Sequence, residues 1–359
     1  MLCTPLAELC REAGGRMVPF AGWELPVQFE GLMAEHRAVR ERCGMFDISH
    51  MGVLTLSGEG VKDKLQGLVP TDLQRIGPGE AQYTVLLNAA GGIRDDLIVY
   101  DRSDREVVVV INAACADSDT AWLKEQLEPL GVAVSDRKAG GVLLALQGPE
   151  AVGRLEQICG ESLAGVPRFG HRDLSINGHT VFAARTGYTG EDGFELLLTA
   201  EAGQPLWQQL QADGVTPCGL GARDSLRLEA AMHLYGNDMD ANTSPLECGL
   251  GWLVHLEMPC DFVGREALER QTADGVKRRL VGLELQGRAI ARHDYPVLHG
   301  GEAVGVITSG TFSPTLQKPV ALASVPAHLA KTGTELAVEI RGRQEPAVVV
   351  KRPFYRRAS

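Results

Sequence analysis

The chain has 359 residues, of which 44% are hydrophobic and 23% charged, and its mean hydropathy is −0.05. These values exclude a disordered chain, a coiled coil and a disulfide miniprotein, and no apolar run is long enough for a membrane helix. A net charge of −11 and a pI of about 5.4 argue against a nucleic-acid-binding protein. We therefore expect a cytoplasmic globular protein of two or three domains, with no membrane or nucleic-acid partner.

The charge is unevenly distributed along the chain. Residues 1–275 hold 22 Lys/Arg and 40 Asp/Glu, net −18, whereas residues 276–359 hold 13 and 6, net +7. This change of sign indicates a separate C-terminal domain whose surface meets something anionic. The alternative is a basic surface that only neutralises its acidic neighbour.

Hydrophobic periodicity predicts a mixture of helices and strands. In chain order, we expect a helix at 31–43, strands at 53–56, 83–87, 96–100 and 106–111, a helix at 117–130, strands at 142–146, 180–185 and 194–198, and helices at 205–211 and 221–233. Short apolar runs separated by Gly/Pro turns then follow at 280–285, 303–308, 320–325, 336–340 and 347–351. This last pattern predicts a small all-β barrel.

Several common catalytic motifs are missing. The eight cysteines form no CxxC pair and the histidines no HExxH, so a zinc or iron–sulfur site has no local support. The sequence also lacks a P-loop, GxGxxG and GxSxG. This pattern argues against ATPases, dinucleotide-binding dehydrogenases and α/β-hydrolases.

The first polar cluster is GGIRDDLIVY, residues 91–100. Because side chains alternate along a strand, Asp95 and Asp96 must point to opposite faces. One of these carboxylates is then placed to enter a pocket, where it could accept a proton or stabilise a developing cation. The alternative is a pair of turn residues that only cap the backbone.

The second cluster is ARTGYTGEDGFEL, residues 184–196, in which glycines flank Tyr188 and precede Glu195. This spacing would let the backbone pass close to a flat ligand, with Tyr188 available for stacking. The alternative is a glycine-rich hairpin without a ligand.

The third cluster is GARDSLRLEAAMHLYGND, residues 221–238, which places Arg223, Arg227 and Ala230 on one predicted helical face. Arg227, between two leucines, could form a buried fork for a planar donor–acceptor edge. The alternative is an ion pair with Glu229 or Asp224.

Eight segments together resemble one known family. They are MVPFAGWELPVQF (17–29), FDISHMG (46–52), QYTVLLNAAGGIRDDLIVY (82–100), ARTGYTGEDGFEL (184–196), DSLRLEA (224–230), LYGNDMD (234–240), GLGW (249–252) and TSGTFSPTLQKPVALASVP (308–326). From about residue 4 to 355 the chain is similar to the T-protein of the glycine cleavage system, a tetrahydrofolate-dependent aminomethyltransferase.

The resemblance implies an α+β fold with three domains in a cloverleaf and folate in a central channel. Residues 1–260 would hold two α/β subdomains with ferredoxin-like features, the second at about 53–136, and residues 276–356 the β-barrel. It also implies a reaction with lipoylated H-protein as partner. The aminomethyl group on the lipoyl sulfur would give its one-carbon unit to tetrahydrofolate, releasing ammonia and dihydrolipoyl H-protein, without metal, flavin or nicotinamide.

The resemblance assigns roles to individual residues. Asp96 corresponds to the essential aspartate of the family. Glu195 and Arg227 match residues that recognise the pterin edge. The remaining assignments are folate contacts at Met51, Tyr83, Asn112, Tyr188, Tyr235 and Trp252, and a channel-mouth arginine at Arg292. Tyr235 and Trp252 could equally be core residues.

Three alternatives share parts of this pattern. A folate-dependent demethylating dehydrogenase uses the same scaffold behind a flavin domain, and the sequence holds no segment that fits one. A related folate-binding factor of iron–sulfur maintenance carries a KGC signature, which is missing here. A structural or interaction protein would bind no folate.

Overall fold

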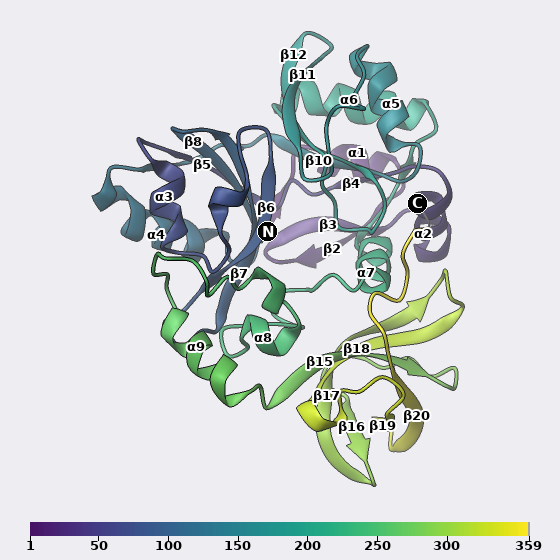
Figure 1. Cartoon of the computed structure of the whole chain (residues 1–359). Coiled ribbons are helices and arrows are strands. Elements are labelled where there is room, and N and C mark those ends of the chain that lie inside the picture. Colours follow the sequence, from purple (N-terminus) through teal and green to yellow (C-terminus); the bar gives the residue numbers. More distant parts are fainter. Residues whose placement is uncertain (358–359) are drawn as a thin grey trace. The chain divides into compact units, whose positions relative to one another are not determined.

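The computed structural model describes residues 1–357 (Figure 1). The chain forms two compact units. Unit 1 comprises Met1–Leu65, Leu73–Tyr83 and Leu97–Asp224, and unit 2 comprises Gln66–Asp72, Thr84–Asp96 and Ser225–Ser359. Each unit is described on its own.

The largest sheet of unit 1 has six strands. Their order is β11 (His171–Ile176), β12 (His179–Ala184), β13 (Gly193–Leu198), β10 (Val142–Gln147), β4 (Gly44–Asp47) and β14 (Thr216–Pro217). All neighbours pair antiparallel except β14 and β4, which are parallel. A second sheet has the order β1 (Leu2–Cys3), β3 (Trp23–Gln28) and β2 (Arg16–Phe20).

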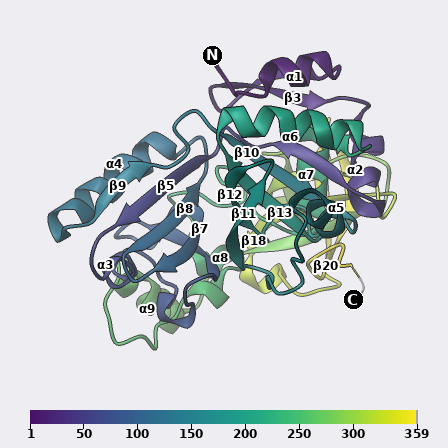
Figure 2. The same cartoon turned by 90° about the horizontal axis from the view of Figure 1, so that it is seen from above.

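Helices cover one face of the six-stranded sheet. The helices that lie wholly or partly in unit 1 are α1 (Ala7–Glu12), α2 (Leu32–Glu41), α3 (Val61–Gln66), α4 (Ala116–Leu127), α5 (Ala151–Cys159), α6 (Ala200–Ala212) and α7 (Leu220–Glu229), with short 3-10 turns at Leu73–Arg75 and Glu128–Leu130. Trp207 of α6 and Leu155 of α5 are fully buried in one core with Leu144, Phe194 and Leu196 of the sheet. Figure 2 shows α6 lying along β10. Alternate residues of each strand thus face the helices, and the intervening residues face away.

A five-stranded sheet crosses the boundary between the units within two of its strands. Its order is β6 (Ala81–Leu87), β7 (Ile93–Ser103), β8 (Glu106–Ile111), β5 (Gly52–Ser57) and β9 (Ala133–Asp136). Residues up to Tyr83 of β6 and from Leu97 of β7 belong to unit 1. The strands expected at 96–100 and 106–111 are confirmed, and β7 and β8 pair antiparallel as a hairpin.

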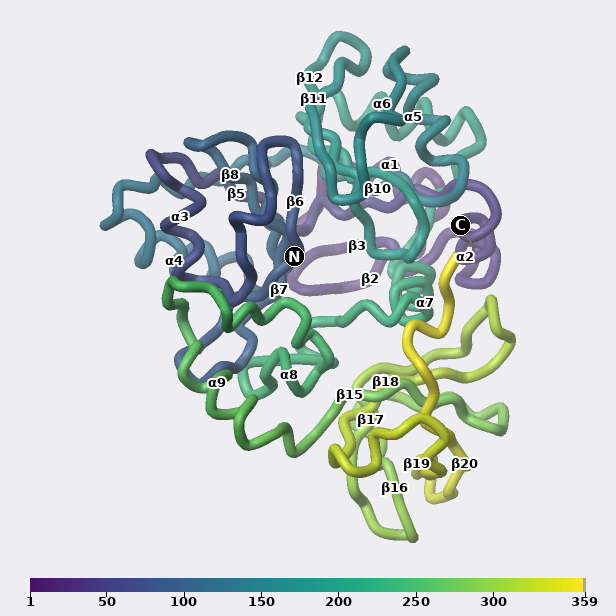
Figure 3. The backbone as a smooth tube through the Cα atoms, viewed as in Figure 1, coloured from purple at the N-terminus to yellow at the C-terminus, as the bar shows by residue number. Residues whose placement is uncertain are grey.

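Unit 2 contains a closed barrel. Its strands are β15 (Arg278–Leu285), β18 (Lys318–Pro326), β17 (Glu302–Ser313), β16 (Pro296–His299), β19 (Glu335–Ile340) and β20 (Arg343–Val350), and β20 pairs back onto β15. Figure 3 follows this path from green to yellow. Alternating apolar residues such as Val281, Leu283, Ala321 and Ala323 fill the interior. The remaining elements of unit 2 are α8 (Pro245–Cys248), α9 (Arg265–Asp274) and the 3-10 turns Gly251–Leu253 and Ala327–Leu329.

The predicted mixed α and β class and the C-terminal barrel are confirmed, and some boundaries are corrected. The helix expected to end at His233 ends at Glu229, because the chain turns at Ala231 with a φ of 54°. The helix expected from Pro205 begins at Ala200, capped by Thr199, so Pro205 lies inside it. Strand β7 begins at Ile93, so Asp95 and Asp96 lie within the strand.

Within residues 1–357, none of the helices has both the length and the apolar character needed to cross a membrane.

Candidate functional site

Glu195 lies in the middle of β13, on the face opposite the helical core. Its neighbours Phe194 and Leu196 are fully buried toward the helices, so alternation turns Glu195 the other way. There its Oε2 accepts a hydrogen bond from Thr186 Oγ1 at 2.6 Å, and Thr186 Oγ1 lies 3.2 Å from Tyr100 Oη. Burial raises the pKa of Glu195, although the hydrogen bond from Thr186 opposes the shift. The result is a carboxyl group held among hydroxyls, in a setting that disfavours its charged form relative to water.

Tyr188 lies in the loop between β12 and β13. The guanidinium of Arg223, on α7, lies over its ring at 4.6 Å from the centroid, a distance at which cation and π-system attract. The charge of Arg223 also lowers the pKa of Glu195, although burial remains the larger influence. Tyr188, Glu195 and Arg223 therefore form one group within unit 1.

The glycines of this loop are explained by close packing. A Cβ at Gly187 would lie 1.9 Å from Gln147 Oε1, and one at Gly193 would lie 2.2 Å from Leu146 O. Gln147 Nε2 donates to Thr186 O at 3.0 Å, and its Oε1 accepts from Thr189 Oγ1 at 2.8 Å. The glycines therefore leave room for the side chain of Gln147, whose hydrogen bonds hold the loop in place.

A buried ion pair further fixes the loop. Arg40 Nη1 donates to Glu191 Oε1 at 2.9 Å and to Thr189 O at 2.7 Å, and both charged side chains are buried. Removing either partner would leave an uncompensated buried charge. Tyr188 is thus presented by a rigid loop.

Met51 lies in a turn that is held by a lysine. Lys138 Nζ donates to Met51 O at 2.6 Å and also to Ser49 O. The neighbouring His50 is buried, its Nδ1 has no hydrogen-bond partner among residues 1–357, and Phe20 meets its ring edge-on. Burial, aided by nearby cations, lowers the pKa of His50 to about 3. This histidine, which sequence reasoning missed, is therefore neutral at physiological pH.

Tyr83 and Asn112 also lie in unit 1. Tyr83 is half-buried on β6, and Asn112 directly follows β8, where its carbonyl accepts from Cys115 N at 3.1 Å. The candidates that fall in unit 1 are Met51, Tyr83, Asn112, Tyr188 and Glu195. Those that fall in unit 2 are Asp96, Arg227, Tyr235, Trp252 and Arg292.

Asp95 and Asp96 point to opposite faces of β7, as alternation predicts. Asp95 is fully buried and Asp96 half-buried.

The glycine pair of the same motif allows a close approach of two loops. A Cβ at Gly92 would lie 1.9 Å from Ala241 O. Asn88 Nδ2 donates to Ala241 O at 2.8 Å, and Ile93 N donates to the carbonyls of Asp240 and Thr243. The start of β7 is thus fixed by its backbone three residues before Asp96.

Arg227 is buried and bonded within unit 2. Its Nη1 donates to Asp238 Oδ2 at 2.7 Å and to Met232 O at 3.2 Å, and its Nη2 donates to Ser309 Oγ at 2.8 Å. Only 2% of the residue is exposed. Arg227 therefore forms an ion pair with Asp238, which lies beyond the helix and which the helical spacing did not suggest.

The other candidates of unit 2 differ in exposure. Tyr235 is half-buried, and its Oη donates to Ile93 O at 3.2 Å. Trp252 is 61% exposed, which excludes a core role. Arg292 is exposed on the barrel, and its Nη1 donates to Gly310 O at 3.2 Å.

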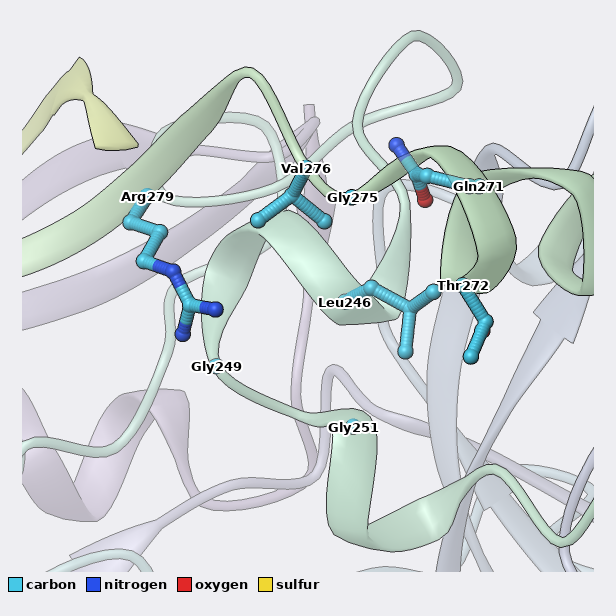
Figure 4. A pocket seen from close by; sticks show the side chains of 8 residues that line it. All are labelled: Leu246, Gly249, Gly251, Gln271, Thr272, Gly275, Val276 and Arg279. Carbon is cyan, nitrogen blue, oxygen red and sulfur yellow. The ribbon is translucent and has the colours of Figure 1, made fainter. Parts of the chain in front are cut away.

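Unit 2 also contains an open pocket of about 380 Å³ beside α8 and α9 (Figure 4). Its lining residues are Leu246, Gly249, Gly251, Gln271, Thr272, Gly275, Val276 and Arg279. None of the ten candidates lines it, although Gly251 precedes Trp252.

Comparison with known proteins identifies the class. Residues 6–258 match the family described as "GCVT N-terminal domain", and residues 278–356 match the "Glycine cleavage T-protein C-terminal barrel domain". A curated aminomethyltransferase of Synechococcus sp. (strain RCC307) is 88% identical to this chain over 99% of both chains. The aminomethyltransferase of Synechococcus sp. (strain CC9902) is 70% identical to it over 99% of this chain and 100% of the relative.

A solved structure agrees with these relatives. The crystal structure of glycine cleavage system aminomethyltransferase T from Bartonella henselae superposes with a TM-score of 0.93 at 35% identity, covering 99% of this chain and 98% of that one. The fold and its relatives thus define an aminomethyltransferase, which is a one-carbon transferase. The chain belongs to the glycine cleavage T-protein family, whose members use tetrahydrofolate as a substrate.

Proposed function

We propose that the protein transfers the one-carbon unit of an aminomethyl group, carried on the lipoyl sulfur of H-protein, to tetrahydrofolate. The carbon–sulfur and carbon–nitrogen bonds break, two carbon–nitrogen bonds to folate form, and the products are 5,10-methylenetetrahydrofolate, ammonia and dihydrolipoyl H-protein. The one-carbon unit keeps its oxidation state, so the proposed reaction requires no flavin or nicotinamide, and we assign it no metal. The observation that carries the proposal is Asp96, a half-buried carboxylate on a strand that is fixed by its backbone.

Asp96 is the proposed acid–base residue. The folate amine must approach an iminium-like carbon, and positive charge develops on the folate nitrogens as it does so. A carboxylate beside the reacting nitrogen orients it, takes its proton and stabilises that charge. The hydrogen bonds at Ile93 N fix the backbone of Asp96's strand before the substrate arrives.

Glu195 is proposed to accept hydrogen bonds from the pterin amino group and ring N–H. Its environment supports this role, because a desolvated carboxyl gains more from charge-assisted donors than an exposed one does. Tyr188, held by Arg223, provides an aromatic face next to it. Arg227 is proposed to donate to the acceptor side of the pterin, with its guanidinium plane set by Asp238.

The remaining assignments follow from exposure and position. We propose folate contacts for Met51, Tyr83, Asn112, Tyr235 and Trp252, and a channel-mouth role for Arg292. The exposed Trp252 and Arg292 are accessible to a partner, as such roles require.

We further propose residues 1–260 and 276–356 as domains, in keeping with the two family matches. A reducing compartment, the cytoplasm, suits the cysteines, which are all free thiols.

The test compares Asp96→Asn with Asp95→Asn. In turnover with aminomethylated H-protein and tetrahydrofolate, we expect Asp96→Asn to lower kcat by about 10²–10⁴-fold, the usual contribution of a positioned acid–base group. Asp95→Asn changes the buried face of β7, so it should lower stability more than rate. Equal rate losses in two folded variants would remove the Asp96 assignment.

A further inference from the structure

The segment 234–243, which follows α7, contacts two parts of unit 2. Tyr235 Oη donates to Ile93 O at 3.2 Å, and Ile93 N donates to Asp240 O at 3.1 Å and to Thr243 O at 3.0 Å. Asn237 Nδ2 donates to Thr308 O of the barrel at 3.2 Å. The segment therefore joins the start of β7 to strand β17 of the barrel.

Asp238 lies at the centre of this segment, and its side chain is fully buried. Its Oδ2 accepts from Arg227 Nη1 at 2.7 Å and from Leu234 N at 2.9 Å, and its Oδ1 accepts from Thr308 Oγ1 at 2.5 Å. A buried carboxylate is stable when it is paired and fully hydrogen-bonded, and these three contacts meet that condition.

The same carboxylate sets the orientation of Arg227. Contacts from Asp238 and Met232 O fix Nη1, and Ser309 Oγ fixes Nη2. A planar guanidinium held at both Nη atoms has its remaining N–H directions determined as well. Without the charge of Asp238, the strongest of these contacts would be lost.

We propose that Asp238 is a positioning residue of the folate site. It holds the plane of Arg227, and through segment 234–243 it ties that guanidinium to the strand that carries Asp96. This inference rests on the proposed role of Arg227 in binding the pterin. Asp238 acts through Arg227 and the loop, without touching the substrate.

Glu229 provides a matched control. It is also a fully buried carboxylate of unit 2 that is bonded to barrel hydroxyls, accepting from Ser313 Oγ at 2.5 Å and from Thr315 Oγ1 at 2.8 Å. Glu229→Gln and Asp238→Asn therefore make the same chemical change in similar surroundings, and Asp238 is the carboxylate whose Oδ2 pairs with Arg227.

The experiment measures the Kd of tetrahydrofolate by titration, alongside Tm, for the full-length protein. Both variants should lose thermal stability. Asp238→Asn should raise the Kd by about 10- to 100-fold, as expected for loss of a hydrogen-bonded charge, whereas Glu229→Gln should leave it within about twofold. In combination with Arg227→Lys, Asp238→Asn should add little further loss, because both changes remove the same interaction, whereas Glu229→Gln should act independently.

The outcomes separate this inference from the proposed function. If the wild type binds no tetrahydrofolate, the proposed function fails. If Arg227→Lys weakens binding but Asp238→Asn matches Glu229→Gln, the positioning role is wrong. If Asp238→Asn does not fold, the inference is tested with Thr308→Val, which removes the hydroxyl that donates to Asp238. Ser313→Ala is its control, because it removes a hydroxyl that donates to Glu229. An unchanged Kd in Thr308→Val would then overturn the inference, and a rise of several-fold would support it.

Discussion

Gly92→Ala is expected to weaken unit 2 because there is no room for the added methyl group. The new Cβ would lie 1.9 Å from Ala241 O, and such contacts essentially never fall below 3.0 Å, so the two loops must separate by about 1.1 Å or more. The hydrogen bonds at risk are Asn88 Nδ2 to Ala241 O and Ile93 N to the carbonyls of Asp240 and Thr243. Ile93 N is one N–H shared between two carbonyls, so two donors are at risk; at about 1 kcal/mol net for each, the loss is about 2 kcal/mol.

Thermal denaturation followed by circular dichroism measures this effect. For a cooperative unit of this size, about 2 kcal/mol corresponds to a fall in Tm of about 4–8 °C. Gly153→Ala is the control, because Gly153 lies in α5 and a Cβ there meets no atom within 4 Å. That variant should keep or gain stability, since alanine favours a helix over glycine. If the Tm of Gly92→Ala equalled that of Gly153→Ala, the close-packing explanation of the glycine pair would be refuted.

Three further predictions concern charge. Because burial raises the pKa of Glu195, folding penalises its charged form, and Glu195→Gln should gain stability at pH 7. That gain should shrink as the pH falls through the raised pKa of the folded state and should be gone by about pH 4.5, the ordinary pKa of a glutamate. The same variant should weaken tetrahydrofolate binding by about 1–3 kcal/mol. Folding lowers the pKa of His50 from 6.5 to about 3, so the wild type should lose stability as the pH falls from about 6.5 to about 3. In urea titrations, the free energy of unfolding of His50→Gln should depend less steeply on pH over this range. The exposed Lys351 and Arg356 should steer an acidic carrier toward the protein. The kcat/KM for H-protein should therefore fall steeply as the salt concentration rises, and replacing both residues by Glu should make this fall less steep.

Arg352 belongs to the same basic C-terminal run as Lys351 and Arg356, but it is not expected to steer a carrier. A Cβ at Gly249 would lie 2.5 Å from its Nη2, so the guanidinium lies against the backbone of unit 2. Burial lowers the pKa of Arg352, as expected for a cation withdrawn from solvent. Local sequence could not separate this arginine from its exposed neighbours.

The barrel could be predicted from sequence because its strands carry a local signal. Apolar runs such as 320–325 and 336–340 alternate with Gly/Pro turns, and the structure places strands at both. Strand β16 was missed, because Pro296–His299 is only four residues long. Helix α9 was also missed, because most residues of Arg265–Asp274 are polar and only Leu268 is buried.

For the candidate site, local rules gave the orientation of side chains but not their partners. Alternation correctly separated Asp95 from Asp96. Helical spacing, however, suggested Glu229 or Asp224 as partners of Arg227, whereas Asp238 lies on the loop beyond α7, where no periodic rule applies. Long-range contacts of this kind depend on how the chain folds back, which a local pattern does not record.

The most direct measurement of the proposed function is a single-turnover experiment with aminomethylated H-protein, tetrahydrofolate and the purified protein. The account predicts one ammonia and one 5,10-methylenetetrahydrofolate per carrier consumed, with release of both slowed together in Asp96→Asn. Ammonia release that is equally fast without tetrahydrofolate, or no methylene product with the wild type, would contradict it.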